Sequence, residues 1–253
     1  MTHQMHEYPV FHNAKVQKFP LCGLKKTTIC SKSIFREQNL NLITENKPKH
    51  GNSQKTTSKV EPMKVRLDNI RRARQKALHI AMLTSFTHFI TWTLDKRKIN
   101  CCDLSEVNSV LKTFLKNCAL RYDLTYLVVP ELHKSGAIHM HGLINGNMKL
   151  VDSGHRYWGG RIIYNMPQWK YGWTTAIPMH GDQRQIAYYL TKHINDTERR
   201  ILGNYYYAGG NNLVRKPETE LCDLNYDEVI VDKVYSVPYT ELCFKYLDEE
   251  YVP

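Results

Sequence analysis

The stretch Glu-Leu-His-Lys-Ser-Gly-Ala-Ile-His-Met-His-Gly, residues 131–142, decides how the rest of the chain is interpreted. His139 and His141 are separated by one apolar residue, Met140. If this segment is a strand, successive side chains point to opposite faces, so both imidazoles project from one face. Met140 then faces the other way, toward a core.

A second strand is predicted just upstream. Leu-Val-Val-Pro at 127–130 is typical of a short strand, and residues 134–136 supply a turn that folds it back beside the histidines. The hairpin would place Glu131 opposite the two imidazoles. Two histidines and one carboxylate with open positions suit Mn²⁺ or Mg²⁺. A structural or solvated His-x-His pair is the alternative, and the hairpin alone does not decide between them.

Length and composition favour a globular protein. The chain has 253 residues, of which 42% are hydrophobic and 11% aromatic, enough for one large domain with extensions. It has no run of about 18 apolar residues, so we expect no membrane span. We also expect no secretory signal. Seven cysteines without a Cys-x-x-Cys pair indicate neither a disulfide framework nor a zinc knuckle. A reducing cytoplasm is the expected setting.

Charge is distributed unevenly along the chain. Residues 1–80 hold 16 Lys and Arg against 5 Asp and Glu, whereas residues 217–253 hold 10 acids and 2 bases. A basic front favours a polyanion such as nucleic acid, and a poorly ordered, solubilising leader has the same composition. The predicted organisation is a basic, poorly ordered leader (1–62), a basic helix that either contacts DNA or is solvated (63–86), a core domain (87–215) and an acidic C-terminal extension (216–253).

Alternation and capping signals predict the elements of the core. Residues 88–95 alternate apolar and polar side chains and predict a strand. Asp103 begins an amphipathic helix. Residues 173–177 predict another strand within an aromatic segment, 155–178. Its exposed rings would stack single-stranded bases, although ordinary packing explains most of them.

A last helix is predicted from Asp182 to about Asn195. Tyr189 lies at the border of its apolar stripe, Lys192 follows one turn later, and Tyr188 points further toward solvent. A reactive side chain belongs at such a border, close to the sheet and open to substrate.

The order of these motifs resembles that of the HUH-type rolling-circle replication initiators (Rep proteins) of phages, plasmids and small single-stranded DNA viruses. Phe89–Leu94 is similar to their first motif, and His139-Met140-His141 to the His-hydrophobic-His motif. Tyr189 and Lys192 are similar to Tyr-x-x-Lys, and Glu131 has the spacing of the third metal ligand. The resemblance covers residues 87–215.

The resemblance implies an α+β fold with a central antiparallel sheet of about five strands flanked by helices, like an RNA-recognition motif or polymerase palm. It also implies a metal-dependent DNA endonuclease and strand transferase. Glu131, His139 and His141 would hold Mn²⁺ or Mg²⁺, which polarises the scissile phosphate. Tyr189 would attack and form a 5′-phosphotyrosine link, and Lys192 would hold the phosphate or balance charge. A tyrosine hydroxyl is protonated at neutral pH, so its attack needs activation.

A one-tyrosine enzyme is expected, because His193 occupies the position four residues after Tyr189 where two-tyrosine members place their second tyrosine. Tyr189 is favoured over Tyr188 as the nucleophile. The expected substrate is single-stranded DNA at an origin, in the cytoplasm of a bacterial host. The sequence has no Gly-x-x-x-x-Gly-Lys-Ser/Thr loop, so a separate helicase and polymerase are expected. The alternatives are an HUH transposase or mobilisation protein, a non-catalytic nucleic-acid-binding protein of the same fold, and a zinc hydrolase, for which no His-Glu-x-x-His motif is present.

Overall fold

The computed structural model describes residues 9–37, 67–132, 137–194, 200–230, 233–236 and 242–250. The chain forms two compact units. Residues 65–217 make the middle unit, and residues 1–64 together with 218–253 make the terminal unit. The basic front and the acidic tail therefore belong to one unit, and the predicted core domain belongs to the other.

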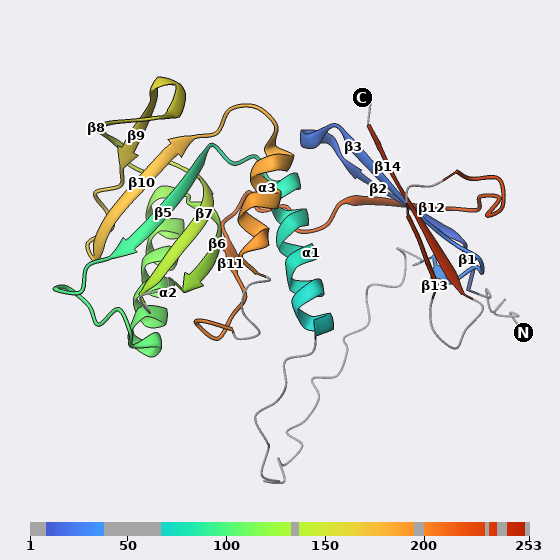
Figure 1. Ribbon diagram of the computed structural model, residues 1–253, viewed down its shortest axis with the longest axis horizontal. Helices are drawn as coiled ribbons and strands as arrows, with labels where there is room; N and C mark the ends of the chain where they lie inside the picture. The colour runs from blue at the N-terminus through green and yellow to red at the C-terminus, as the bar shows by residue number, and fades with distance from the viewer. Residues whose placement is uncertain are drawn as a thin grey trace, which may run out of the picture. The chain divides into compact units, whose positions relative to one another are not determined.

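The middle unit is built on a seven-stranded sheet in the order β11-β6-β7-β5-β10-β9-β8, and its paired strands are antiparallel (Figure 1). The strands are β5 (His88–Leu94), β6 (Thr125–Leu132), β7 (Ile138–Asn145), β8 (Val151–Tyr157), β9 (Arg161–Asn165), β10 (Gly172–Pro178) and β11 (Tyr207–Gly209). Its helices are α1 (Leu67–Leu83), α2 (Leu104–Tyr122), α3 (Gln183–Lys192) and a short 3₁₀ turn, η3 (Trp158–Gly160). The predicted α+β class is confirmed. The sheet has more strands than the five or so expected, because β8, β9 and β11 extend its two edges.

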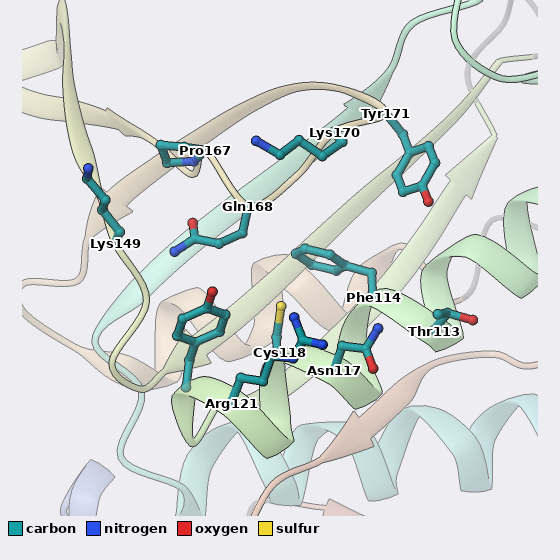
Figure 2. A pocket seen from close by; sticks show the side chains of 11 residues that line it. Thr113, Phe114, Asn117, Cys118, Arg121, Lys149, Pro167, Gln168, Lys170 and Tyr171 are labelled. Atoms are coloured by element: carbon teal, nitrogen blue, oxygen red, sulfur yellow. The ribbon is translucent and has the colours of Figure 1, made fainter.

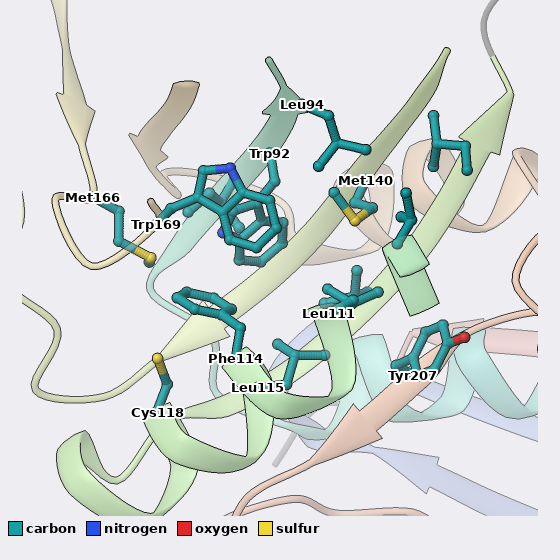
Figure 3. Close-up of a cluster of buried hydrophobic side chains, with 14 of the residues drawn as sticks. Trp92, Leu94, Leu111, Phe114, Leu115, Cys118, Met140, Met166, Trp169 and Tyr207 are labelled. Carbon is teal, nitrogen blue, oxygen red and sulfur yellow. The ribbon is translucent and has the colours of Figure 1, made fainter. Parts of the chain in front are cut away.

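Helix α2 covers one face of this sheet. Trp92 of β5 and Met140 of β7 are fully buried and belong to one cluster with Leu111 and Phe114 of α2 (Figure 3). The ring centroids of Trp92 and Phe114 are 6.4 Å apart, with an edge-to-face angle of 75°. Asp103 caps α2 as predicted, since its carboxylate accepts hydrogen bonds from the second and third backbone N–H groups after it.

Gly142 belongs to the same packed face, although it follows the two histidines directly. A Cβ atom at Gly142 would lie 2.8 Å from Cζ3 of Trp92 and 2.9 Å from the backbone oxygen of Leu127. Both distances are shorter than a close-packed interior allows. The glycine lets the indole lie flat against β7, so it supports the core and not the chemistry.

Helix α3 lies on the opposite face, where the ring of Tyr189 contacts that of Phe89 in β5. Helix α1 lies beside α3 (Figure 1). Gln183 at the start of α3 donates hydrogen bonds to the backbone oxygens of Ala81 (2.6 Å) and Thr84 (2.8 Å) at the end of α1. The basic helix predicted for residues 63–86 is therefore a packed part of the middle unit. In the part of the chain that the structure describes, no helix has the length and apolarity needed to cross a membrane.

The terminal unit contains a five-stranded antiparallel sheet in the order β12-β2-β3-β14-β13. Its strands are β2 (Ala14–Phe19), β3 (Leu24–Cys30), β12 (Glu218–Cys222), β13 (Lys233–Ser236) and β14 (Cys243–Glu250), and the unit also holds β1 (Phe11–His12), η1 (Pro20–Cys22) and β4 (Phe35–Arg36).

This sheet corrects the prediction of a poorly ordered leader for residues 9–37. The basic front and the acidic extension pair with each other. Lys18 Nζ lies 3.1 Å from Oε1 of Glu218, and His12 Nδ1 lies 3.0 Å from Oδ2 of Asp223. The strands of the front are stabilised by partners about 200 residues away, which its local composition does not reveal. The rest of the predicted leader, residues 1–8 and 38–62, lies outside the described residues.

Candidate active site

The pairing of β6 with β7 places the three predicted metal ligands on one face of the sheet. Glu131 is directly opposite His139, and Val129 is directly opposite His141. Because paired residues of antiparallel strands point to the same face, and alternate residues along a strand share it, the carboxylate and both imidazoles project together. The predicted hairpin turn at residues 134–136 lies outside the described residues.

The carboxylate of Glu131 accepts a hydrogen bond from His141. The Nε2 atom of His141 lies 2.7 Å from Oε2 of Glu131, and its Nδ1 atom lies 3.0 Å from the hydroxyl of Thr91 on β5. This arrangement fits the tautomer in which Nε2–H donates to the carboxylate and Nδ1 accepts from the hydroxyl. His141 is therefore held from both sides.

Burial and hydrogen bonding set the protonation of this pair. Burial lowers the pKa of the His141 imidazole and outweighs the hydrogen bond to Glu131, which raises it. Burial opposes ionisation of Glu131, but the hydrogen bond from His141 and the nearby imidazoles together hold the pKa of its carboxyl below the ordinary value. At neutral pH the pair is a carboxylate and a neutral imidazole, the forms that bind metal ions.

His193 completes the group, and it was not among the predicted site residues. Its ring stacks on that of His141, with centroids 5.2 Å apart and planes at 23°. Its Nδ1 atom lies 3.2 Å from Oε1 of Glu131, without the geometry of a hydrogen bond, and neither ring nitrogen has a hydrogen-bond partner among the described residues. The sequence signal was its position four residues after Tyr189, on the same side of the helix.

Tyr189 and Lys192 lie beside these imidazoles on α3. The Tyr189 ring is 5.6 Å from that of Phe89 and 5.5 Å from that of His193, and Nζ of Lys192 lies 4.3 Å from its centroid. Exposure does not separate the two candidate tyrosines, since Tyr188 is 47% exposed and Tyr189 46%. Their contacts do, because no ring or cation–π contact involves Tyr188 within the described residues.

The donors on this face are of the kinds that bind a divalent metal. Imidazole nitrogens and a carboxylate suit Mn²⁺, and both oxygens of Glu131 already face imidazole nitrogens. The buried ring nitrogens of His193 have no other partner in the described part of the chain. Among the described residues, no group of three or more His, Cys, Asp or Glu side chains is already arranged as a metal site. A cation would therefore have to draw these donors together.

The comparison with known families agrees with this group of residues. Residues 87–198 match the model of a family described as Replication-associated protein ORF2. The matched segment begins just before β5 and ends after α3, so it contains the whole group. The match supports a replication initiator and is consistent with nuclease-type activity. No curated protein and no solved structure matches the chain.

The aromatic segment divides into buried and exposed rings, as ordinary packing combined with base stacking predicts. Trp169 is buried in the core beneath the sheet, whereas Trp158 is 91% exposed and Trp173 57%. Trp173 is paired with Thr93, and Thr93 with His139, so this indole lies on the same face as the imidazoles. Its position suits a base of DNA held near the site.

A separate open pocket of about 480 Å³ lies on the α2 side of the sheet (Figure 2). Residues of α2, including Phe114 and Arg121, form one wall, and Lys149, Gln168 and Lys170 from two loops form the other. The sheet separates this pocket from Tyr189, because Phe114 packs on Trp92 and alternate β5 residues face the site. The pocket therefore belongs to the packed face.

Proposed function

We propose that the protein is a replication initiator that nicks single-stranded DNA at an origin and later religates it, as in rolling-circle replication. The observation that carries the proposal is the convergence of Tyr189, His193, His141 and Glu131 in one contiguous chain of contacts. Each link is short: ring centroids 5.5 Å and 5.2 Å apart, then a hydrogen bond of 2.7 Å. A nucleophile from a helix thus lies next to charge-stabilising donors on a sheet.

The proposed reaction is a phosphodiester exchange. The Tyr189 oxygen attacks the scissile phosphorus, the Oη–P bond forms and the P–O3′ bond breaks. The tyrosine loses its proton and the departing 3′ oxygen gains one. The products are a 5′-phosphotyrosine and a free 3′-OH that primes synthesis. Religation is the reverse attack by a 3′-OH, and no external energy source is needed because one phosphodiester replaces another.

Residues around Tyr189 have separate roles in this proposal. A divalent cation, Mn²⁺ or Mg²⁺, held by Glu131, His139 and His141 would polarise the phosphate and stabilise the charge that develops on its oxygens. The exposed ammonium of Lys192, one turn from the nucleophile, would hold a phosphate oxygen. Helicase and polymerase activities would come from other proteins.

The test is a covalent adduct with labelled single-stranded origin DNA and Mn²⁺, detected after denaturation. We expect an adduct that disappears with EDTA and with Tyr189→Phe, and that persists with Tyr188→Phe, a matched control of equal exposure. An adduct that survives Tyr189→Phe but not Tyr188→Phe reassigns the nucleophile. An adduct absent from every sample, together with binding of the same DNA, favours the non-catalytic nucleic-acid-binding protein.

A further inference from the structure

The His193 imidazole is in an unusual position for a histidine without a role. Its side chain is only 9% exposed, and both ring nitrogens are buried without a hydrogen-bond partner in the part of the chain that the structure describes. Buried polar atoms in proteins are nearly always hydrogen-bonded, and an exception calls for an explanation such as an ion. Here the exception lies against Glu131 and His141, on the face that we propose binds metal.

We propose that His193 is itself a ligand of that metal ion, so that the site consists of three imidazoles and one carboxylate. This inference rests on the metal site of the proposed function. The Glu131 carboxylate lies between two imidazoles, with Oε2 2.7 Å from Nε2 of His141 and Oε1 3.2 Å from Nδ1 of His193. Atoms that each bind one metal ion at roughly 2.0–2.3 Å lie close to 3 Å from each other. The donors therefore need to move little to share one ion.

A third imidazole sharpens the choice of metal. Mg²⁺ prefers oxygen ligands and keeps several of its waters, whereas imidazole nitrogens suit transition-metal ions. With three nitrogens and one carboxylate, the site favours Mn²⁺ over Mg²⁺.

The same ligand would connect the metal to the nucleophile. His193 follows the last residue of α3 and keeps helical backbone angles (φ −65°, ψ −15°). Tyr189 lies four residues before it, on the same side of the helix, and the two rings are in contact. A bond from His193 to the ion would therefore fix the turn of helix that presents the Tyr189 hydroxyl.

Metal binding by the full chain, measured without DNA, tests the inference. EDTA-treated protein is titrated with Mn²⁺ by calorimetry, comparing the unaltered chain with His193→Phe, which keeps an aromatic ring against His141 and removes both nitrogens. The matched control is His155→Phe at an exposed position of β8. We expect at least about a tenfold loss of Mn²⁺ affinity for His193→Phe and no change for the control. Equal affinity in all three proteins overturns the inference.

Two spectroscopic measurements separate a ligand from a residue that only positions Glu131. The visible absorption of the Co²⁺-loaded protein depends on the atoms bound to the ion, so His193→Phe should change it. An unchanged spectrum overturns the ligand role. If His193→Phe does not fold, ¹⁵N-histidine NMR of the unaltered protein with one equivalent of Zn²⁺ replaces it. Three shifted imidazoles are expected, and two would overturn the inference.

The proposed function and this inference fail in different ways. If the unaltered protein does not bind Mn²⁺, the metal site itself is wrong. If His139→Gln and His141→Gln weaken Mn²⁺ binding but His193→Phe does not, the metal site stands and only the role of His193 is wrong.

Discussion

The two faces of the central sheet are built from the same strands yet have opposite characters. Met140 is fully buried in the cluster under α2, whereas His141, the next residue, is held by Glu131 and Thr91 on the other face. The same switch occurs on β5, where Trp92 faces the core and Thr91 faces the imidazoles. Strand alternation alone separates them.

The difference shows how a nicking site can be rigid and accessible at once. The α2 face has large side chains and a glycine, Gly142, that admits the Trp92 ring. It fixes the strands. The opposite face uses only short contacts between polar side chains, with Tyr189 and Lys192 exposed beside them. Substitutions on the two faces should therefore affect different properties.

The largest expected contrast is between His139→Ala and Met140→Ala. Loss of a metal ligand should lower adduct formation at least about 100-fold, since even partners of ligands cost 10- to 100-fold. It should change the free energy of unfolding by less than about 1 kcal/mol. Met140→Ala should lower the free energy of unfolding by about 2–5 kcal/mol through the cavity it leaves, and the folded fraction should still form adduct.

Adduct yield per folded molecule and urea unfolding of each variant check this contrast. The comparison of the faces breaks down if His139→Ala destabilises the protein as much as Met140→Ala does. It also breaks down if folded Met140→Ala protein forms no adduct.

Much of the middle unit was predictable because its signals are local. Alternation in residues 88–94, the caps at Asp103 and Asp182, and the hairpin around Glu131 each appear within a few residues of sequence, and the structure contains each corresponding element. The pairing of the β6–β7 hairpin follows from the alternation of the two histidines, because a slip of one residue would turn them into the core.

The terminal sheet and the role of His193 were not predictable, for the same physical reason. Strand β2 pairs on one side with β12, about 200 residues later, and local composition carries no record of such long-range pairing. The sequence likewise fixes His193 four residues after Tyr189. Only the packing of α3 on the sheet places its ring on His141.

A smaller effect is expected from acid, and it should belong to the polar face. The pKa of His141 is lowered, mainly by burial, so the unfolded chain binds more protons than the folded protein below 6.5, the ordinary value. The free energy of unfolding should therefore fall as the pH drops below that value. The pKa of Glu131 is also lowered, through its hydrogen bond and the nearby imidazoles despite burial, and adds a further loss below 4.5.

Urea unfolding in EDTA as a function of pH measures this sensitivity. His141→Gln should flatten the acid loss near pH 6.5 relative to the unaltered protein, and His155→Gln, at an exposed position, should not. A steep loss that persists in His141→Gln would assign the acid sensitivity to groups outside the site.

The smallest effect is expected at the cationic pocket on the α2 side. Lys149 and Lys170 line it (Figure 2), and the core between Phe114 and Trp92 separates it from Tyr189. At saturating DNA, Lys149→Ala and Lys170→Ala should leave adduct yield within about twofold, because neither ammonium can approach the scissile phosphate through the sheet. Lys192→Ala removes the same charge beside the nucleophile, and should lower the yield about tenfold or more. Equal losses at all three positions would mean that the yield follows overall positive charge, and the separation of the two faces would then have no bearing on the chemistry.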